Sequence, residues 1–125
     1  MTDPPISDAE LLARADAIAG RAYAPYSKFD VGCAVLLRDG TVVEGVNVEN
    51  GAYPLGICAE KNGIGTAITQ GYGSGDFEAI AITASPCGGC RQWLHELGFD
   101  RVSFRTRGQV VTMAPAELLP ETFEL

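Results

Sequence analysis

Three cysteines and one glutamate constrain this chain more than any other feature of its sequence. Cys58 is followed two positions later by Glu60, and two glycines separate Cys87 from Cys90. Three thiolates can hold Zn²⁺ and leave its fourth position open for water. A carboxylate beside that water can carry its protons. The chain must therefore fold so that two distant segments meet, and the pattern predicts hydrolytic catalysis.

Both cysteine segments also have the character of helix starts. Cys58 precedes a predicted helix over residues 59–70, and Cys87 opens a second helix that runs to about Leu97. Cys87 and Cys90 are three positions apart, so their sulfurs face the same way on a helix. The positive N-terminal ends of helices favour thiolate over thiol. Two such ends meeting at one point would hold three thiolates and a dication together.

Three different kinds of cysteine site fit the pattern less well. A redox dithiol leaves Cys58 and Glu60 unexplained, and an iron–sulfur site lacks a fourth thiol nearby. A closed structural zinc site would need His95, the single histidine, as its fourth ligand. His95 lies about 7.5 Å beyond Cys90 along a helix axis and well round from it, which suits a surface or capping role. Cys33 lies in an apolar strand, where an inert buried thiol is expected.

Length, charge and the first residues narrow the class of protein. The 125 residues suit one domain over 1–125, and no apolar run approaches the ~20 residues that span a bilayer. Residues 1–7 lack a basic start and an apolar stretch, so we expect no signal peptide and a cytoplasmic location without membrane contact. Four cysteines in such a chain argue against a disulfide framework. The net charge of −7 disfavours a nucleic-acid partner, and the alternating Arg101, Arg105 and Arg107 predict one exposed strand face.

The order of predicted elements indicates an α/β fold. Ser7 and Glu10 form a capping box before a helix that ends ahead of Pro25. Asp39-Gly40 is a hairpin signal. Helices between strands imply a sheet that is at least partly parallel and covered by helices. The predicted strands are 31–37, 41–48, 77–84, 101–106 and 109–113, and Pro115 begins a short last helix.

Polar and charged residues beside these segments suggest further roles. Asn47 and Glu49 end a strand two positions apart, so on extended backbone they point to one side and could grip vicinal hydroxyls. Turn chemistry could equally account for this Asn- and Gly-containing stretch, and the choice stays open at this point. A cation that reduces the charge of three thiolates would help the metal acidify its water. Lys61 and Arg91 are the candidates, with solvated surface charge as the alternative for each.

The cysteine segments 58–60 and 86–92 (Pro-Cys-Gly-Gly-Cys-Arg-Gln) closely resemble the zinc site of the small, homotetrameric cytidine deaminases. Residues 24–29 and 47–50 resemble that family's substrate segments, and 119–123 its C-terminal tail. The resemblance covers nearly the whole chain. It implies a three-layer α-β-α sandwich around a mixed five-stranded sheet. It also implies one Zn²⁺ per subunit, held by Cys58, Cys87 and Cys90.

The resemblance further implies the chemistry of zinc deaminases, in which a zinc-bound hydroxide attacks C4 of the pyrimidine. Glu60 would protonate N3 and then pass the second proton to the departing ammonia. The implied function is deamination of cytidine and deoxycytidine to the uridine nucleosides in pyrimidine salvage. The remaining implied contacts are Ala59 N–H to the base carbonyl, Ser85 C=O near the exocyclic amine, Phe29 on the base, Asn47 and Glu49 to ribose hydroxyls, Tyr53 and Phe123 reaching neighbouring subunits, and Lys61, Arg91 and Gln92 behind the ligands.

The chain departs from the family pattern at a few positions. Lys61 stands where the family usually has Arg, and Pro54 where it commonly has Gly. The segment from Cys58 to Cys87 is short, and the usual polar loop before Ser85 is missing. This suggests a roomier leaving-group side that accepts N4-substituted cytosines. A blasticidin-S-type deaminase and a non-catalytic zinc module also stay open; residues 47–50 favour a nucleoside, and the acidic balance and Cys58 disfavour a polynucleotide.

Overall fold

The computed structural model describes residues 5–122 and begins with a capped helix. Helix α1 (Asp8–Ala19) follows Ser7, whose side chain accepts from the Glu10 N–H at 3.1 Å while the Glu10 carboxylate accepts from the Ser7 N–H at 3.2 Å. The predicted capping box is confirmed. The helix buries Leu11, Leu12 and Ala15 and ends ahead of Pro25, as predicted.

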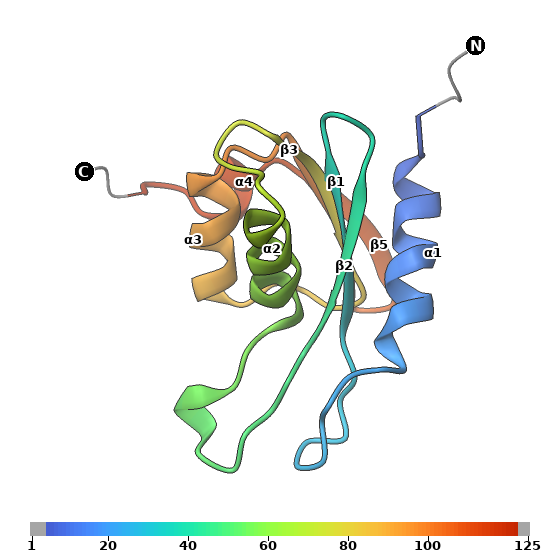
Figure 1. Ribbon diagram of the computed structural model, residues 1–125, viewed down its shortest axis with the longest axis vertical. Coiled ribbons are helices and arrows are strands. Elements are labelled where there is room, and N and C mark those ends of the chain that lie inside the picture. The colour runs from blue at the N-terminus through green and yellow to red at the C-terminus, as the bar shows by residue number, and fades with distance from the viewer. Residues whose placement is uncertain (1–4, 123–125) are drawn as a thin grey trace.

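Five strands form one mixed sheet. They are β1 (Gly32–Leu37), β2 (Val42–Val46), β3 (Phe77–Ile82), β4 (Arg101–Thr106) and β5 (Gln109–Met113), in the spatial order β2-β1-β3-β4-β5. Only β3 and β4 of these pair in parallel; the other neighbours are antiparallel. The order and the mixed pairing are visible in Figure 1.

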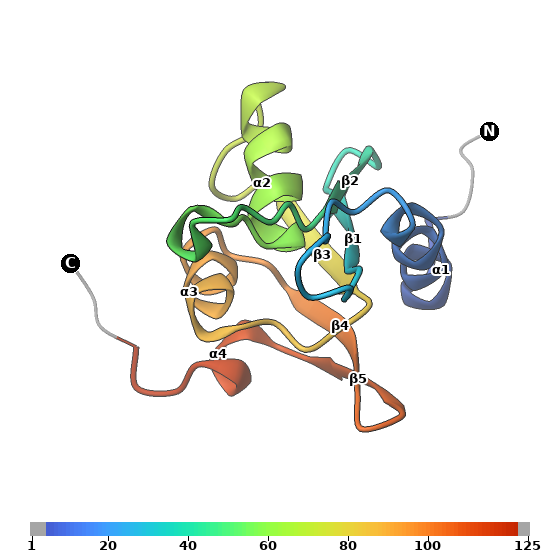
Figure 2. The same cartoon turned by 90° about the horizontal axis from the view of Figure 1, so that it is seen from below.

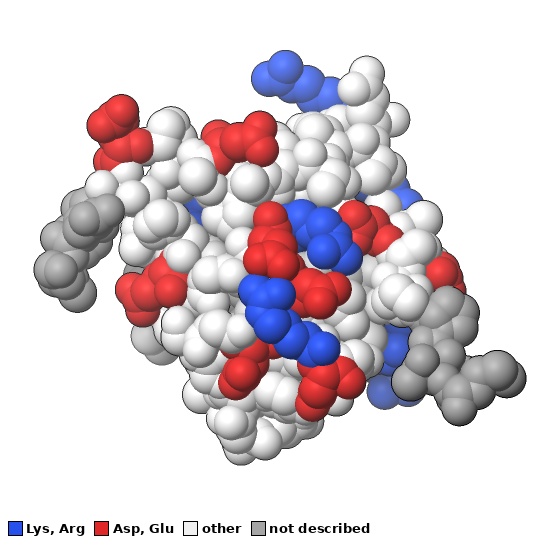
Figure 3. Space-filling model, turned by 90° about the horizontal axis from the view of Figure 1, so that it is seen from above, with Lys and Arg blue, Asp and Glu red and all other residues white. Residues whose placement is uncertain are grey.

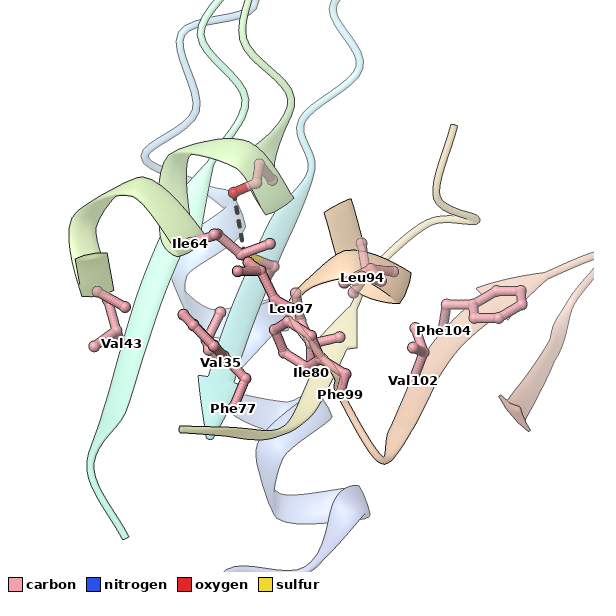
Figure 4. Close-up of a cluster of buried hydrophobic side chains, with 14 of the residues drawn as sticks. Val35, Val43, Ile64, Phe77, Ile80, Leu94, Leu97, Phe99, Val102 and Phe104 are labelled. Carbon is pink, nitrogen blue, oxygen red and sulfur yellow. Dashed lines mark hydrogen bonds between the residues drawn. The ribbon is translucent and has the colours of Figure 1, made fainter. Parts of the chain in front are cut away.

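Helices cover both faces of this sheet, so the predicted three-layer sandwich is confirmed. Helix α1 lies on one face, and α2 (Ala59–Thr69), α3 (Gly88–Glu96) and the short α4 (Pro115–Leu118) lie on the other (Figure 2). The larger core lies on the α2 and α3 side, where Ile64 and Leu94 pack toward the sheet (Figure 4). The Phe77 and Phe99 rings meet in this core at 5.0 Å.

Two glycines bring helices directly onto strand backbone. A β-carbon on Gly32 would lie 2.2 Å from the Ala15 carbonyl oxygen, and one on Gly45 would lie 2.5 Å from the Ala59 oxygen. Real β-carbons do not approach backbone this closely, so only glycine fits at either position. The close contact at Gly45 sets the position of the first turn of α2 over β2.

The strands end earlier than predicted. Strand β2 stops at Val46 and β3 at Ile82. Beyond β2, Val48 makes isolated bridges to Tyr23 and Ile57 instead of continuing along β1. The 3-10 turn at Tyr53–Leu55 was not predicted. As a result, the polar end of β2 lies among loops, at the edge of the sheet where β3 also ends.

The arginine cluster is neutralised by acidic residues. Arg101 pairs with Asp8 at 2.8 Å, and Arg105 pairs with Asp16, so both face α1. Arg107 lies in the turn after β4 with φ 53°, which corrects its predicted place on a strand face. The space-filling view of another face likewise shows acidic and basic groups interspersed (Figure 3). Among the described residues, no helix is long and apolar enough to cross a membrane.

Candidate metal and active site

The three predicted metal ligands come together at two helix starts. Cys58 is the N-cap of α2 and Cys87 the N-cap of α3, with Cys90 in the first turn of α3. The Cys87 sulfur lies 3.7 Å from that of Cys58 and 3.4 Å from that of Cys90. Tetrahedral zinc with Zn–S bonds near 2.3 Å needs sulfurs about 3.8 Å apart. The three thiols therefore fit Zn²⁺, and His95, in the last turn of α3, is not part of this group.

Burial sets the protonation of these thiols. It raises the pKa of Cys58 and of Cys90 above the usual value for a thiol. Burial also acts on Cys87, but the Cys90 N–H and the neighbouring thiols outweigh it, and the pKa of Cys87 is lowered. A cation that binds all three as thiolates must therefore displace protons.

Glu60 is a buried carboxyl beside the cysteines. It lies in the first turn of α2 and is only 4% exposed. Burial raises the pKa of Glu60, partly offset by its backbone N–H, by Cys90 and by the Lys61 ammonium. A carboxyl whose charged form is disfavoured in this way can take up a proton near neutral pH and release it again.

Lys61, Arg91 and Gln92 lie next to the ligand segments, as their positions in the sequence require. The Lys61 ammonium lies over the Gly-Gly turn, since a β-carbon on Gly89 would be 3.5 Å from its nitrogen. The Arg91 guanidinium is directed at oxygen acceptors: the Pro86 carbonyl, the Leu118 carbonyl and the Ser85 hydroxyl. Gln92 is half-buried on α3.

A cavity of about 170 Å³ opens onto these groups. Its lining includes Cys58, Cys87 and Glu60, together with residues from three loops: Phe29, Val31, Asn47, Ala59, Ala84 and Ser85. Ala59 begins α2, and the first N–H groups of a helix have no acceptor within it. Larger hollows exist elsewhere, one of about 630 Å³ near the β1–β2 turn, but the metal-ligating and proton-carrying groups line this one.

Asn47 and Glu49 organise the loop that carries Phe29. The Asn47 side chain accepts from the Val31 N–H at 2.8 Å and donates to the Phe29 carbonyl at 2.9 Å. One Glu49 oxygen accepts from the N–H groups of Tyr26 and Ser27 at 3.0 and 3.1 Å. The Ser27 hydroxyl and these N–H groups lower the pKa of Glu49. No local signal in the sequence could have revealed these partners, because they are 16 to 23 positions away.

The two residues border adjoining spaces. Asn47 lines the cavity with the cysteines, whereas Glu49 lines a neighbouring hollow of about 330 Å³ together with Asn50 and Tyr53. Both side chains face the same loop, as expected for positions two apart on extended backbone.

The open side of the site carries exposed aromatic rings. Phe29 is 61% exposed and Tyr53 is 75% exposed. Tyr53 packs edge-on against Tyr26, with ring centres 6.3 Å apart. Phe123, the second residue predicted to reach a neighbouring subunit, lies outside the described residues.

Comparison with known proteins places this site in context. Residues 5–106 match the family described as the cytidine and deoxycytidylate deaminase zinc-binding region. The cytidine deaminase of Sporosarcina psychrophila is 37% identical over 123 residues, covering 91% of this chain and 89% of its own. That of Halalkalibacterium halodurans is 41% identical over 113 residues, covering 82% and 83%.

Solved structures agree with the sequence comparison. The cytidine deaminase from Burkholderia pseudomallei superposes with a TM-score of 0.86 at 38% identity, covering 94% of this chain and 100% of its own. The cytidine deaminase from Mycobacterium tuberculosis gives 0.83 at 36% identity, covering 96% and 99%. The likeness therefore extends over the whole fold as well as the cysteine segments.

Proposed function

The chain belongs to the cytidine and deoxycytidylate deaminase family, and from that premise we propose that it deaminates cytidine and deoxycytidine to uridine and deoxyuridine. One observation supports this above all others: Cys58, Cys87 and the buried Glu60 line one cavity, with Cys90 completing the sulfur cluster. The reaction consumes one water and releases one ammonia. A role in pyrimidine salvage follows from these substrates.

Cys58, Cys87 and Cys90 would hold one Zn²⁺ in each subunit. When bound, the ion lowers the pKa of a water and so supplies the nucleophile for C4 of the base. The cluster lies at the N-termini of α2 and α3, whose dipoles favour the thiolate form of the ligands. The Lys61 ammonium over the Gly-Gly turn reduces the local negative charge further.

Glu60 would move the protons of the reaction. Its carboxylate accepts a proton from the attacking water and delivers it to N3 of the ring. It then takes the remaining proton from the C4 hydroxyl to the exocyclic nitrogen, which leaves as ammonia. Burial suits the carboxyl to both steps, because it makes the protonated form accessible near neutral pH.

The cavity wall supplies groups that would hold the nucleoside. The Ala59 N–H would bind the base carbonyl, the Ser85 carbonyl would lie near the amine, and Phe29 would pack on the base. Asn47 and Glu49 would bind ribose hydroxyls with the hydrogen-bonding capacity that their loop contacts leave, since Glu49 uses one oxygen for both N–H groups.

A homotetramer with shared sites would explain the apolar rim. Tyr26, Phe29, Tyr53, Leu55 and Ile57 are all exposed around the mouth of the site. Exposed apolar groups gathered in this way are typical of an interface. Light scattering measures the assembly state, and mixing two inactive variants, one altered at Glu60 and one at Tyr53, would restore activity if subunits share sites.

Acceptance of N4-substituted cytosines is a second candidate function. The wall at the end of β3 carries the small side chains of Ala84 and Ser85, and the Ser85 hydroxyl is directed at Arg91 rather than into the cavity. A blasticidin-S-type substrate is an alternative within the same chemistry. A non-catalytic zinc module is the alternative outside it.

One assay separates these functions. Ultraviolet absorbance is followed with zinc-loaded protein and cytidine, deoxycytidine, N4-methylcytidine, N4-acetylcytidine and blasticidin S. Turnover of the two unmodified nucleosides supports the main proposal, and a flat response to all five compounds overturns it. Turnover of cytidine with rejection of both N4 derivatives overturns the second candidate alone.

A further inference from the structure

Arg91 makes contacts that the chemistry above does not use. Its Nε donates to the Pro86 carbonyl at 3.0 Å, one terminal nitrogen to the Ser85 hydroxyl at 3.3 Å, and the other to the Leu118 carbonyl at 3.0 Å. A single half-buried side chain on α3 thus spans the loop before α3 and the helix α4.

The first two acceptors of this guanidinium belong to the wall of the cavity. Ser85 and Cys87 line it, and Pro86 lies between them in the chain. Only residues 83–87 lie between the end of β3 and the start of α3, so this wall has little regular structure of its own. The contacts of Arg91 hold Ser85 and Pro86 in place immediately before a metal ligand.

The third acceptor belongs to a different element. Leu118 ends α4, and the last carbonyls of a helix have no donor within it. The Leu118 side chain is buried in the larger core, so its carbonyl has a defined position. Arginine suits this geometry because its planar fork presents several donors in fixed directions, which a lysine ammonium cannot do.

We propose that Arg91 is a positioning residue that ties α4 to the cavity wall at Ser85 and Pro86. The effect on turnover rests on the proposed function; the structural coupling does not. The hypothesis differs from a role in offsetting thiolate charge, because it depends on the shape of the guanidinium and not on its charge alone.

Arg91→Lys tests this distinction, because it keeps the charge and removes the fork. We expect kcat/KM for cytidine to fall by about 10- to 100-fold, as for residues that orient metal ligands. Amide hydrogen exchange should also accelerate together in residues 85–88 and 115–119. A charge-offset role predicts near-normal turnover and unchanged exchange in α4.

Arg38→Lys is the matched control. Arg38 also spans two segments, donating to the Gly75 carbonyl and to both oxygens of Asp100, but it lies at the opposite end of β1. Its replacement should change kcat/KM by no more than about twofold, as expected for a surface position. It should leave exchange in 85–88 and 115–119 unchanged.

The wild-type protein supplies a measurement that does not depend on a variant folding. With ¹⁵N-arginine labelling, the Arg91 Nε–H should exchange with solvent more slowly than an exposed guanidinium, because it is bonded to the Pro86 carbonyl. Free exchange at this nitrogen, normal turnover in Arg91→Lys, or loosening of only one of the two segments would each overturn the proposal. If the wild-type protein deaminates no cytosine nucleoside, the proposed function fails while the exchange data still decide the role of Arg91.

Discussion

A β-carbon on Gly63 would lie 2.9 Å from the sulfur of Cys33, so the missing side chain on α2 makes room for the thiol on β1. Cys33 is fully buried, and its thiol donates to the Ala59 carbonyl at 3.2 Å (the dashed bond in Figure 4). The two residues therefore form a complementary pair of sizes beneath the first turns of α2. That helix carries Glu60 and begins at Cys58.

This pairing predicts strong coupling between substitutions at the two positions. Gly63→Ala alone should destabilise the protein by about 1–3 kcal/mol through overpacking. Cys33→Ala alone should cost about 1 kcal/mol. In the Cys33→Ala background, Gly63→Ala should become neutral or stabilising by up to about 1 kcal/mol, because alanine favours a helix. Denaturant unfolding with saturating zinc measures all four proteins.

Gly65→Ala is the control for this cycle. Gly65 lies on the same helix, exposed, and a β-carbon there meets nothing within 4 Å. It should stabilise both backgrounds equally. Additive effects of Cys33→Ala and Gly63→Ala would show that the sulfur does not limit the space at position 63.

Glu60→Gln should separate catalysis from metal binding. The amide cannot carry protons, so kcat for cytidine should fall by at least about 100-fold. Zinc content, measured by atomic emission, and the thermal unfolding temperature should stay close to wild type. Glu44→Gln, at a surface pair with Arg14 on β2, should retain full activity. Loss of zinc from Glu60→Gln would instead assign this residue a part in holding the metal.

Zinc binding should release protons. Because burial raises the pKa of Cys58 and Cys90, both thiols are protonated at pH 7 in the metal-free protein. We expect about two to three protons to be released per subunit and the apparent affinity to rise with pH. Calorimetry in buffers of different ionisation enthalpy gives the number.

Cys33 tests which thiols contribute to this release. Burial raises the pKa of Cys33 as well, yet it lies outside the sulfur cluster. Cys33→Ala should therefore leave the proton count unchanged, and Cys90→Ser should reduce it. A count near zero for the wild type would show that the three ligands are already thiolates.

Glu49 should contribute to recognition of the sugar. If its carboxylate binds a ribose hydroxyl, Glu49→Gln should bring kcat/KM for cytidine toward that for 2′,3′-dideoxycytidine, closing most of a preference of about tenfold. Glu44→Gln should keep the preference. An unchanged ratio in Glu49→Gln would limit this residue to holding the loop.

The pH dependence of the Glu49 loop follows from the same carboxylate. Its pKa is lowered in the folded protein, so its contribution to stability is present above the ordinary carboxyl pKa and is lost as pH falls through the lower folded value. Protection of the Tyr26 and Ser27 amides, corrected for intrinsic exchange, should persist to about pH 4.5 and fall below it. In Glu49→Gln the protection should not vary with pH over this range.

Much of the molecule could be predicted from local patterns. Ser7 and Glu10 mark the start of α1, and Cys58 and Cys87 mark the starts of α2 and α3, because helix caps depend on residues a few positions apart. Cys33 was correctly expected to be buried, since it lies in an apolar run. The chemical character of three cysteines and one glutamate was enough to predict a zinc centre.

The tertiary structure alone decided which distant groups meet. The contact between Cys33 and Gly63, the loop partners of Asn47 and the reach of Arg91 to the Leu118 carbonyl join residues that no local pattern relates. Each depends on backbone positions set by the order of strands and by close helix–sheet contacts such as that at Gly45. Residue types along the chain therefore determined the chemistry of Cys58 and Glu60, whereas packing determined how firmly that chemistry is held, because backbone acceptors acquire positions only when the elements assemble.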